Sequence, residues 1–198
     1  MQTEIEAKFL DIDHAQMRQK LKKIGATCQQ PMITMKRVNL DFADKALENK
    51  GGWLRIRDNG NKITLTYKQL ESWSLHGVKE IETTVGDYAA AEQIMNAIGL
   101  VAKAYQITRR ETWEYNGCEV VLDEWPWIKP LLEIEGPSEN DVKELAAKLG
   151  LTWKEALFGS VEPAYMAEFN ITEKEFYELK DISFDSKPPK WLEERRRK

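Results

Sequence analysis

The feature that most constrains the fold is a strand-like alternation that puts charged side chains on one face. The chain opens M-Q-T-E-I-E-A-K-F, and along an extended strand successive side chains point to opposite faces. Glu4, Glu6 and Lys8 therefore share one face, while the residues between them are apolar. Burying an unpaired charge is costly, so an ordinary apolar core would not accept the charged face. A cavity filled with water or ions would accept it.

The same alternation returns in later segments of strand-like composition. One such segment alone is also typical of a sheet with one face in solvent. A solvated face usually mixes charges with neutral polar residues, whereas here acids are grouped in some segments and bases in others. Like charges two residues apart repel, so the whole set favours a shared charged interior. Its members are Glu80, Glu82, Asp123, Glu133 and Glu135 among the acids, and Arg55, Arg57, Lys68 and Arg110 among the bases.

Helix and strand signals predict a sheet with helices packed outside it. Three segments begin with a capping residue and end near a glycine, which is typical of helices, at residues 11–25, 87–99 and 138–150. Asn-Gly pairs at 59–60 and 116–117 separate strand-like runs, as hairpin turns do. About eight strands joined mostly in sequence order favour an antiparallel sheet or barrel. The strand-like runs are residues 4–9, 34–42, 53–57, 62–68, 78–85, 107–115, 118–125 and 131–136.

The C-terminal part has a different character. Residues 173–184 are compatible with a helix, and residues 185–198 are broken by two adjacent prolines and then become strongly basic. Such an end is typical of a solvated, partly disordered tail. The alternative is a basic helix that covers an acidic or phosphate-filled opening.

Composition argues against several classes of function. With 198 residues, 31% charged side chains and a net charge of −4, the chain lacks the basic field of a nucleic-acid-binding protein. No apolar run approaches ~18 residues and no signal peptide opens the chain, so we expect a cytoplasmic protein without a membrane partner. Cys28 and Cys118 are far apart, as are His14 and His76, so any metal would be held by oxygen ligands.

A lumen lined by these charges would have a specific chemistry. Clustered carboxylates favour hard cations, so the expected metal is Mg²⁺ or Mn²⁺. Arginine and lysine clusters favour phosphate oxygens. Both together would bind a metal–polyphosphate complex, which is the recurring apparatus of phosphoryl and nucleotidyl transfer. The sequence has no G-x-x-x-x-G-K-[ST] motif, so a P-loop is not the phosphate cradle.

The motifs, taken in order, resemble those of CYTH-domain proteins, also called triphosphate tunnel metalloenzymes. E-I-E-A-K is similar to the E-x-E-x-K motif that opens this family, and WLRIR, TLTYK, KEIE, RRETW, VVLDE and LLEIEG follow in family order up to about Tyr165. The family includes class IV adenylyl cyclases, thiamine triphosphatases and inorganic triphosphatases. The resemblance implies an α+β fold, an eight-stranded antiparallel β tunnel with helices packed outside. It also implies a tunnel domain at residues 1–170, followed by a C-terminal helix and basic tail at 171–198.

The resemblance further implies two groups of ligands inside the tunnel. Lys8 is the implied catalytic residue, because in the hydrolases of the family this lysine is thought to help activate the attacking water, often beside a tyrosine. The implied triphosphate-binding residues are Lys8, Arg37, Arg55, Arg57, Lys68 and Arg110. The implied metal ligands are Glu4, Glu6, Glu80, Glu82, Asp123, Glu133 and Glu135.

The sequence departs from the family pattern in two places. The second strand of the family often carries a tyrosine near the lysine, whereas K-R-V-N-L-D has Asn39 at that position. Tyr67 and Tyr115 cannot replace it, because their phase points them outward. The family also often has a basic or Ser-Tyr element in its C-terminal part, for which this chain offers Ser160 and Tyr165, with Lys154 nearby.

The expected function is metal-dependent hydrolysis of an inorganic, thiamine or nucleoside triphosphate. One alternative is a class IV-type adenylyl cyclase that makes cyclic AMP and pyrophosphate from ATP. A second alternative, raised by Asn39, is a tunnel that binds polyphosphate or nucleotide without turnover. A structural barrel with a solvated charged face is the remaining interpretation. The expected partner is a small-molecule triphosphate, with the protein as a monomer or homodimer.

Overall fold

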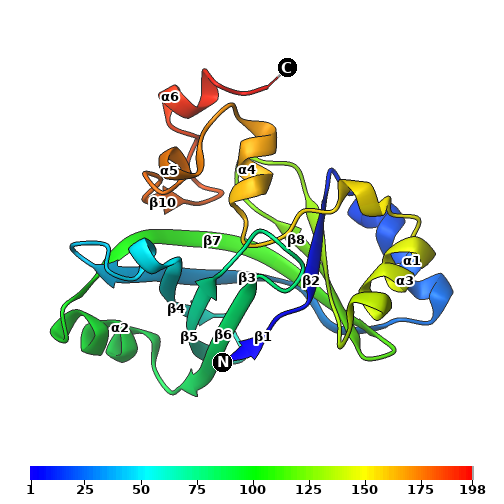
Figure 1. Cartoon of the computed structure of the whole chain (residues 1–198), viewed down its shortest axis with the longest axis horizontal. Coiled ribbons are helices and arrows are strands. Elements are labelled where there is room, and N and C mark those ends of the chain that lie inside the picture. The colour runs from blue at the N-terminus through cyan, green and yellow to red at the C-terminus, as the bar shows by residue number, and fades with distance from the viewer. Residues whose placement is uncertain (198) are drawn as a thin grey trace.

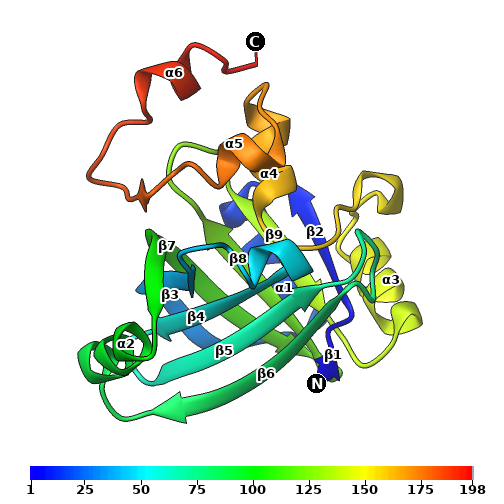
Figure 2. The same cartoon turned by 60° about the vertical axis from the view of Figure 1, so that its left-hand side comes forward.

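The computed structural model describes residues 1–197 and is built around one strongly curled antiparallel sheet (Figures 1 and 2). Lys198, the last residue of the predicted tail, lies outside the described residues. The strands are β1 (Gln2–Thr3), β2 (Glu6–Leu10), β3 (Thr27–Phe42), β4 (Gly52–Asp58), β5 (Ile63–Leu70), β6 (Val78–Val85), β7 (Leu100–Tyr115), β8 (Cys118–Glu124), β9 (Leu131–Glu135) and β10 (Asp181–Ile182). The helices are α1 (His14–Ile24), η1 (Glu48–Lys50), α2 (Tyr88–Ala97), α3 (Glu139–Lys148), η2 (Trp153–Glu155), α4 (Glu162–Glu168), α5 (Glu173–Phe176) and α6 (Lys190–Glu193).

The N-terminal run joins the two edges of the sheet. The strand order is β1-β6-β5-β4-β3-β7-β8-β9-β2, so consecutive strands β1 and β2 stand at opposite ends of the order. The run changes partner in its middle, where the amide of Glu4 donates to Val78 O (2.9 Å) and the carbonyl of Ile5 accepts from Gly136 N (3.0 Å). The predicted antiparallel tunnel is therefore confirmed. Its eight predicted strands become nine in the order because one run counts as β1 and β2.

Two strands extend beyond their predicted starts. The prediction began β3 at residue 34 and β7 at residue 107, whereas the two strands pair from Thr27 and Leu100 respectively. Register shifts between Cys28 and Gln30 and between Gln30 and Ile33 interrupt the simple alternation in the first part of β3. Such bulges remove the period-2 signal on which the prediction relied.

Helices cover the outer, apolar face of the sheet. Outward residues of β2, β7, β8 and β9, including Phe9, Trp113 and Ile134, form one buried cluster with residues of α1 and α3. A second cluster joins the outer faces of β3 and β4 to Ala91 of α2. The three helices begin at the predicted caps, where the carboxylates of Asp13 and Asp87 and the hydroxyl of Ser138 accept backbone N–H groups. No helix within residues 1–197 is both long and apolar enough to cross a membrane.

The C-terminal elements gather over one end of the curled sheet (Figure 1). Residues of α4 and α5 form a buried cluster with Trp125, Leu131 and Leu192, so the tail packs against this end. The predicted helix at 173–184 is wrong beyond its first turn, because the chain leaves α5 at Tyr177 and pairs in parallel with β7 through β10. The amide of Tyr105 donates to Lys180 O (2.8 Å) beside this pairing.

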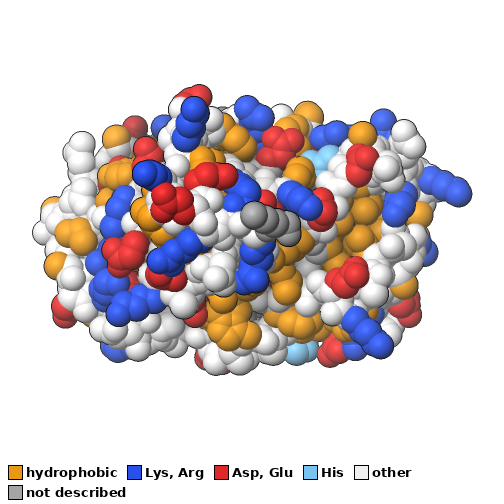
Figure 3. All heavy atoms as spheres, turned by 90° about the horizontal axis from the view of Figure 1, so that it is seen from above, with side chains coloured by type: hydrophobic (Ala, Val, Ile, Leu, Met, Phe, Trp, Pro, Cys, Tyr) orange, Lys and Arg blue, Asp and Glu red, His pale blue; other side chains and the backbone are white. Residues whose placement is uncertain are grey.

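The basic tail is anchored by ion pairs on the outer side of α4 and α5. Arg196 pairs with Glu168 (2.6 Å) and lies over the ring of Phe169, while Arg195 pairs with Glu175. Figure 3 shows side chains of both charge signs mixed over this face of the molecule. Within the described chain, the tail is thus packed rather than free in solvent.

Two isoleucines that occupy equivalent places in the sequence test this architecture. Ile134 lies between Glu133 and Glu135 and is fully buried, whereas Ile81 lies between Glu80 and Glu82 and is 57% exposed. We expect Ile134→Ala to lower the free energy of unfolding by about 2–5 kcal/mol, because it opens a cavity beneath α3. Ile81→Ala should change it by about 0.5 kcal/mol or less. Equal losses in urea titrations of the two variants would contradict the observed orientation of β6 or β9.

Candidate functional site

All of the predicted site residues line one cavity inside the curled sheet. The cavity has a volume of about 300 Å³. Alternation places these residues inward on their strands, with buried apolar neighbours such as Ile56 and Ile134 facing the helices. The residues that the sequence predicted and the cavity brings together are Glu4, Glu6, Lys8, Arg37, Arg55, Arg57, Lys68, Glu80, Glu82, Arg110, Asp123, Glu133 and Glu135.

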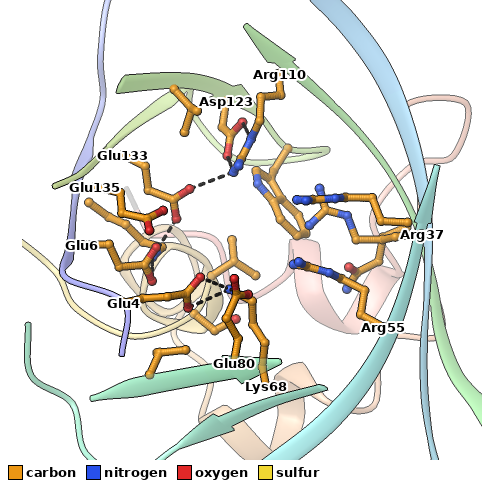
Figure 4. A pocket seen from close by; sticks show the side chains of 18 of the residues that line it. Glu4, Glu6, Arg37, Arg55, Lys68, Glu80, Arg110, Asp123, Glu133 and Glu135 are labelled. Atoms are coloured by element: carbon orange, nitrogen blue, oxygen red, sulfur yellow. Dashed lines mark hydrogen bonds and ion pairs between the residues drawn. The ribbon is translucent and has the colours of Figure 1, made fainter. Parts of the chain in front are cut away.

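Charge is divided between two sides of this cavity. Figure 4 shows Glu4, Glu6, Glu133 and Glu135 on one side and the guanidinium groups of Arg37 and Arg55 on the other. The first group comes from the N-terminal run and β9, and the second from β3 and β4. The cavity therefore presents an acidic wall to a basic one.

Lys8 is held as a cation within the acidic wall. Its ammonium lies 2.7 Å from Glu6 Oε1 and 2.6 Å from Glu133 Oε1, and it donates to Gly159 O at 2.5 Å. Burial opposes the charge, but the carboxylates of Glu133 and Glu6 outweigh burial and raise the pKa of Lys8. In this arrangement Lys8 can donate hydrogen bonds to a ligand but cannot accept a proton.

Two other predicted phosphate ligands are also paired with acids. Lys68 lies 2.6 Å from Glu4 Oε1 and 3.3 Å from Glu80 Oε2. Arg110 binds Asp123 through two nitrogens and also lies 2.7 Å from Glu133 Oε2. Burial again opposes the charged form, and Asp123 and then Glu133 raise the pKa of Arg110 above its ordinary value.

The arginines of the basic wall lack such partners. Within the described chain, neither Arg37 nor Arg55 forms an ion pair, and the nearest acid to Arg57 is Glu82 at 3.6 Å. Arg37 is 5% exposed, donates to Thr108 Oγ1 (2.7 Å) and lies over the ring of Trp125. The Nε atoms of all three arginines are buried without a hydrogen-bond partner.

Burial and mutual repulsion destabilise the charged forms of these arginines. Burial lowers the pKa of Arg37 most, and the neighbouring charges of Arg55 and Arg57 lower it further. Burial and then the charge of Arg110 lower the pKa of Arg55. The pKa of Arg57 falls to about 9, chiefly because of the charge of Arg55. Uncompensated buried cations are costly, so a bound polyanion would stabilise them.

The acidic wall has the donor chemistry of a hard-cation site. Burial, followed by the charges of Glu4, Glu6 and Glu119, raises the pKa of Glu135 to about 7. Such crowding of carboxylates is relieved by a divalent cation that accepts oxygen ligands. Among residues 1–197, however, no three acidic, histidine or cysteine side chains already converge in a metal-binding geometry. The acids fit Mg²⁺ or Mn²⁺ by chemistry, with ion pairs to Lys8, Lys68 and Arg110 in their present arrangement.

Several lining residues were missed by the sequence interpretation. Glu119 and Gln106 lie four residues before Asp123 and Arg110 and are in phase with them, so following the alternation back along each strand would have found them. Trp125, Glu162 and Phe176 lie at the end of the cavity covered by α4 and α5. No local signal identified the last two, because their position depends on how the C-terminal part folds back.

The two predicted departures from the family pattern can now be placed. Asn39 faces the cavity, and within the described chain no tyrosine lines it. Tyr115 accepts from Lys148 of α3 and is therefore outward, as its phase predicted. Of the C-terminal candidates, Ser160 lines the cavity, whereas Tyr165 is buried and donates to Pro126 O, and Lys154 is exposed.

Glu162 has the most unusual environment among these C-terminal residues. It is 5% exposed, and its Oε2 atom is buried without a hydrogen-bond partner. Burial is the main cause that raises its pKa to about 7. Tyr177 and Glu173 lie on the neighbouring helix, where the hydroxyl of Tyr177 donates to Glu173 Oε1 (2.9 Å).

A smaller cavity of about 120 Å³ adjoins the first at the α5 end. The two share Asn39, Trp53, Gln106 and Phe176 as lining residues. The inward-facing residues change from polar to apolar towards this cavity. On β5 the inward residue after Thr66 and Lys68 is Leu70, and on β4 the inward residue before Arg55 and Arg57 is Trp53. The charged tunnel thus continues into a chamber where apolar and aromatic side chains stand beside charged ones such as Asp41, Lys103 and Glu173.

Solved structures with similar folds come from several organisms. A candidate adenylate cyclase from Vibrio parahaemolyticus has a TM-score of 0.73 and 14% identity, covering 83% of this chain and 98% of the other. A conserved hypothetical protein from Pyrococcus furiosus has a TM-score of 0.66 and 22% identity, covering 78% and 94%. A candidate adenylyl cyclase from Hippeastrum has a TM-score of 0.59 and 16% identity, covering 88% and 94%.

These structural similarities support the fold, and a separate match to a family model identifies the protein family. Comparison with curated protein sequences gives no significant match. The CYTH domain, by contrast, matches residues 2–162, which include every strand from β1 to β9 and the whole charged cavity wall. The chain therefore belongs to the CYTH domain family.

Proposed function

We propose that this protein hydrolyses a triphosphate with the help of Mg²⁺ or Mn²⁺ bound in the charged tunnel. One observation carries the proposal: within the described chain, the guanidinium groups of Arg37 and Arg55 lack acidic partners, have buried Nε atoms without a hydrogen-bond partner, and face a wall of carboxylates. Two such groups are suited to bind phosphate oxygens bidentately. A polyphosphate with a divalent cation would match both walls at once.

Each wall has a distinct role in the proposed reaction. Arg37, Arg55 and Arg57 hold the phosphate chain, and Lys68 and Arg110 reach it from the acidic side. Lys8 donates to a phosphate oxygen as an ammonium, which stabilises charge at the reacting phosphorus. When bound, the divalent cation would neutralise phosphate oxygens and favour attack on phosphorus. The residues proposed to hold the cation are Glu4, Glu6, Glu133 and Glu135, with Glu80, Glu82 and Asp123 around them.

Formation of cyclic AMP from ATP is a second candidate function. The observation that favours it is the adjoining chamber walled by Trp53, Leu70 and Phe176, which offers room for an organic group next to the arginines. The structural neighbours point both ways: the Hippeastrum protein is described as a candidate adenylyl cyclase with a dominant triphosphatase activity. Hydrolysis requires fewer specific parts, so it remains the first candidate.

Product analysis tests the proposal with a matched pair of arginine variants. Wild type, Arg55→Gln and Arg109→Gln are incubated with Mn²⁺ and, separately, tripolyphosphate, ATP and thiamine triphosphate. Arg109 is exposed and pairs with Glu124, so its replacement should leave activity unchanged. Arg55→Gln should lower kcat/KM by about 100-fold, because it removes a preorganised charged donor.

The products separate the candidate functions. Release of orthophosphate by wild type would support the triphosphatase, and cyclic AMP with pyrophosphate would support the cyclase. Tight binding of tripolyphosphate with neither product would leave only the binding module. Equal losses of activity in Arg55→Gln and Arg109→Gln would contradict the role given to the basic wall.

The metal site can be tested through Glu135, for which no ion pair is present within the described chain. We expect Mn²⁺ to raise the Tm of wild type, because a ligand that binds only the folded state stabilises it. Glu135→Gln should weaken Mn²⁺ binding in calorimetric titrations by at least about 10-fold, the loss typical even of an outer-shell partner. Glu139→Gln, at an exposed acid of α3, is the control. Identical Mn²⁺ affinity in all three proteins would exclude Glu135 as a ligand.

A further inference from the structure

The proposed hydrolysis needs a proton acceptor that the described residues of the tunnel walls do not readily provide. Lys8 is already an ammonium, held by Glu6, Glu133 and the carbonyl of Gly159. No tyrosine lines the cavity within the described chain, and Asn39 cannot take up a proton. The wall carboxylates are either paired with cations or crowded together as the proposed metal ligands. The attacking water must therefore find its base elsewhere.

Glu162 lines one end of the cavity that is proposed to hold the phosphate chain. The segment before it lies along β2, because Lys8 and Leu157 exchange both backbone hydrogen bonds (2.9 Å each) and the Lys8 ammonium binds Gly159 O. Helix α4 also lies near the basic wall, since the charge of Arg37 acts on Tyr165, one turn beyond Glu162. Glu162 thus follows the segment that binds the Lys8 ammonium, and the charge of Lys8 acts on its carboxyl group.

Its free acceptor atom distinguishes Glu162 from the other acids. Within residues 1–197, the one buried carboxylate oxygen without a hydrogen-bond partner is Oε2 of Glu162. Leaving such a group unpaired costs free energy, and proteins keep costly arrangements of this kind chiefly at functional sites. Because the residue also lines the cavity, its carboxyl group borders the space that a bound substrate and the attacking water would share.

We propose that Glu162 is the general base that activates the attacking water, which rests on the proposed hydrolysis. One O–H bond of the water breaks and its proton passes to the carboxylate of Glu162. The water oxygen forms a bond to the terminal phosphorus, and the bond between that phosphorus and its bridging oxygen breaks. The bridging oxygen leaves with the electron pair as part of the diphosphate product, so no oxidant or further reactant is required.

The electrostatic surroundings suit a base that works near neutral pH. Burial raises the pKa of Glu162 to about 7, with Glu173 of α5 acting in the same direction. The backbone amide of Glu162 itself, Ser160 and the charge of Lys8 act in the opposite direction. The other titratable group nearby is the hydroxyl of Tyr177, whose own pKa is raised by burial and then by Glu162. A base is most effective when its pKa lies near the working pH. Because only the ionised carboxylate accepts a proton, the rate should rise as pH increases through about 7.

The same burial predicts an opposite effect on stability. Folding raises the pKa of this carboxyl from 4.5 in the unfolded chain to about 7. As pH rises between these values the unfolded state ionises first, so the free energy of unfolding falls. Replacing Glu162 by glutamine removes this ionisation. The Tm of Glu162→Gln should therefore equal or exceed that of wild type at pH 8, whereas a residue needed only for folding would lower it.

The kinetic experiment uses the full chain, Mn²⁺ and tripolyphosphate as the probe. The comparison runs from pH 5.5 to 9 in steps of about half a pH unit and includes wild type, Glu162→Gln, Glu162→Ala and Glu168→Gln. Glu168 lies on the same helix but pairs with Arg196 on its outer side, so Glu168→Gln is the matched control. We expect Glu162→Gln to lower kcat by about 100-fold or more with little change in KM, and to lose the rise near pH 7. Added formate should partly restore turnover to Glu162→Ala.

The outcomes distinguish this inference from the proposed function. Wild-type turnover with kcat and pH profile unchanged in Glu162→Gln would overturn the assignment of Glu162 and leave the triphosphatase intact. A lower kcat with the pH rise retained and no rescue by formate would also overturn it, as a structural effect. Absence of phosphate release from wild type would overturn the proposed function, and the proton transfer with it.

Discussion

Closure of the sheet by its first ten residues is the constraint on which the rest of the structure depends. This run pairs with β6 through β1 and with β9 through β2, so neither edge remains open along it. In a closed sheet, residues in phase with Glu6 face the lumen and residues in phase with Phe9 face the helices. A slip of one residue would place Glu6 and Lys8 in the apolar layer beneath α1 and α3. The register is therefore specified by buried charge as strongly as by the hydrophobic pattern.

Inside the closed sheet, the charges do not cancel evenly. Lys8, Lys68 and Arg110 neutralise much of the acidic wall through short ion pairs. That leaves Arg37, which is buried, and Arg55, which is half-buried, without acidic partners in the described chain, and burial is the main cause that lowers the pKa of each. A protein under selection for stability alone would replace such groups by apolar ones. Their presence is explained most simply by a polyanion that supplies the missing charge.

The sequence could predict the tunnel and its walls because both follow from local alternation. A stretch of three residues is enough to predict that Glu4 and Glu6, or Arg55 and Arg57, share a face of their strand. The Asn-Gly turns predict how neighbouring strands connect. The longer starts of β3 and β7 escaped prediction where bulges break this period. Glu162 and Phe176 escaped it for a different reason. Their place at the cavity depends on contacts such as Lys8 with Gly159, which are 151 residues apart in the chain.

The C-terminal elements connect this fold to its chemistry. The family match ends at residue 162, yet Phe176, Tyr177 and Leu179 of the following segment wall the second cavity. In the proposed function, the strands therefore supply the charges that would hold a triphosphate, and the elements over their end set what lies beside it. Attack by water needs a small polar space with a free carboxylate, as at Glu162, whereas attack by a ribose hydroxyl needs the nucleoside seated in the apolar chamber. Because the elements after β9 contribute different residues to these two environments, we expect that changes there would shift a protein of this fold between the two proposed reactions without altering the strand residues proposed to bind phosphate.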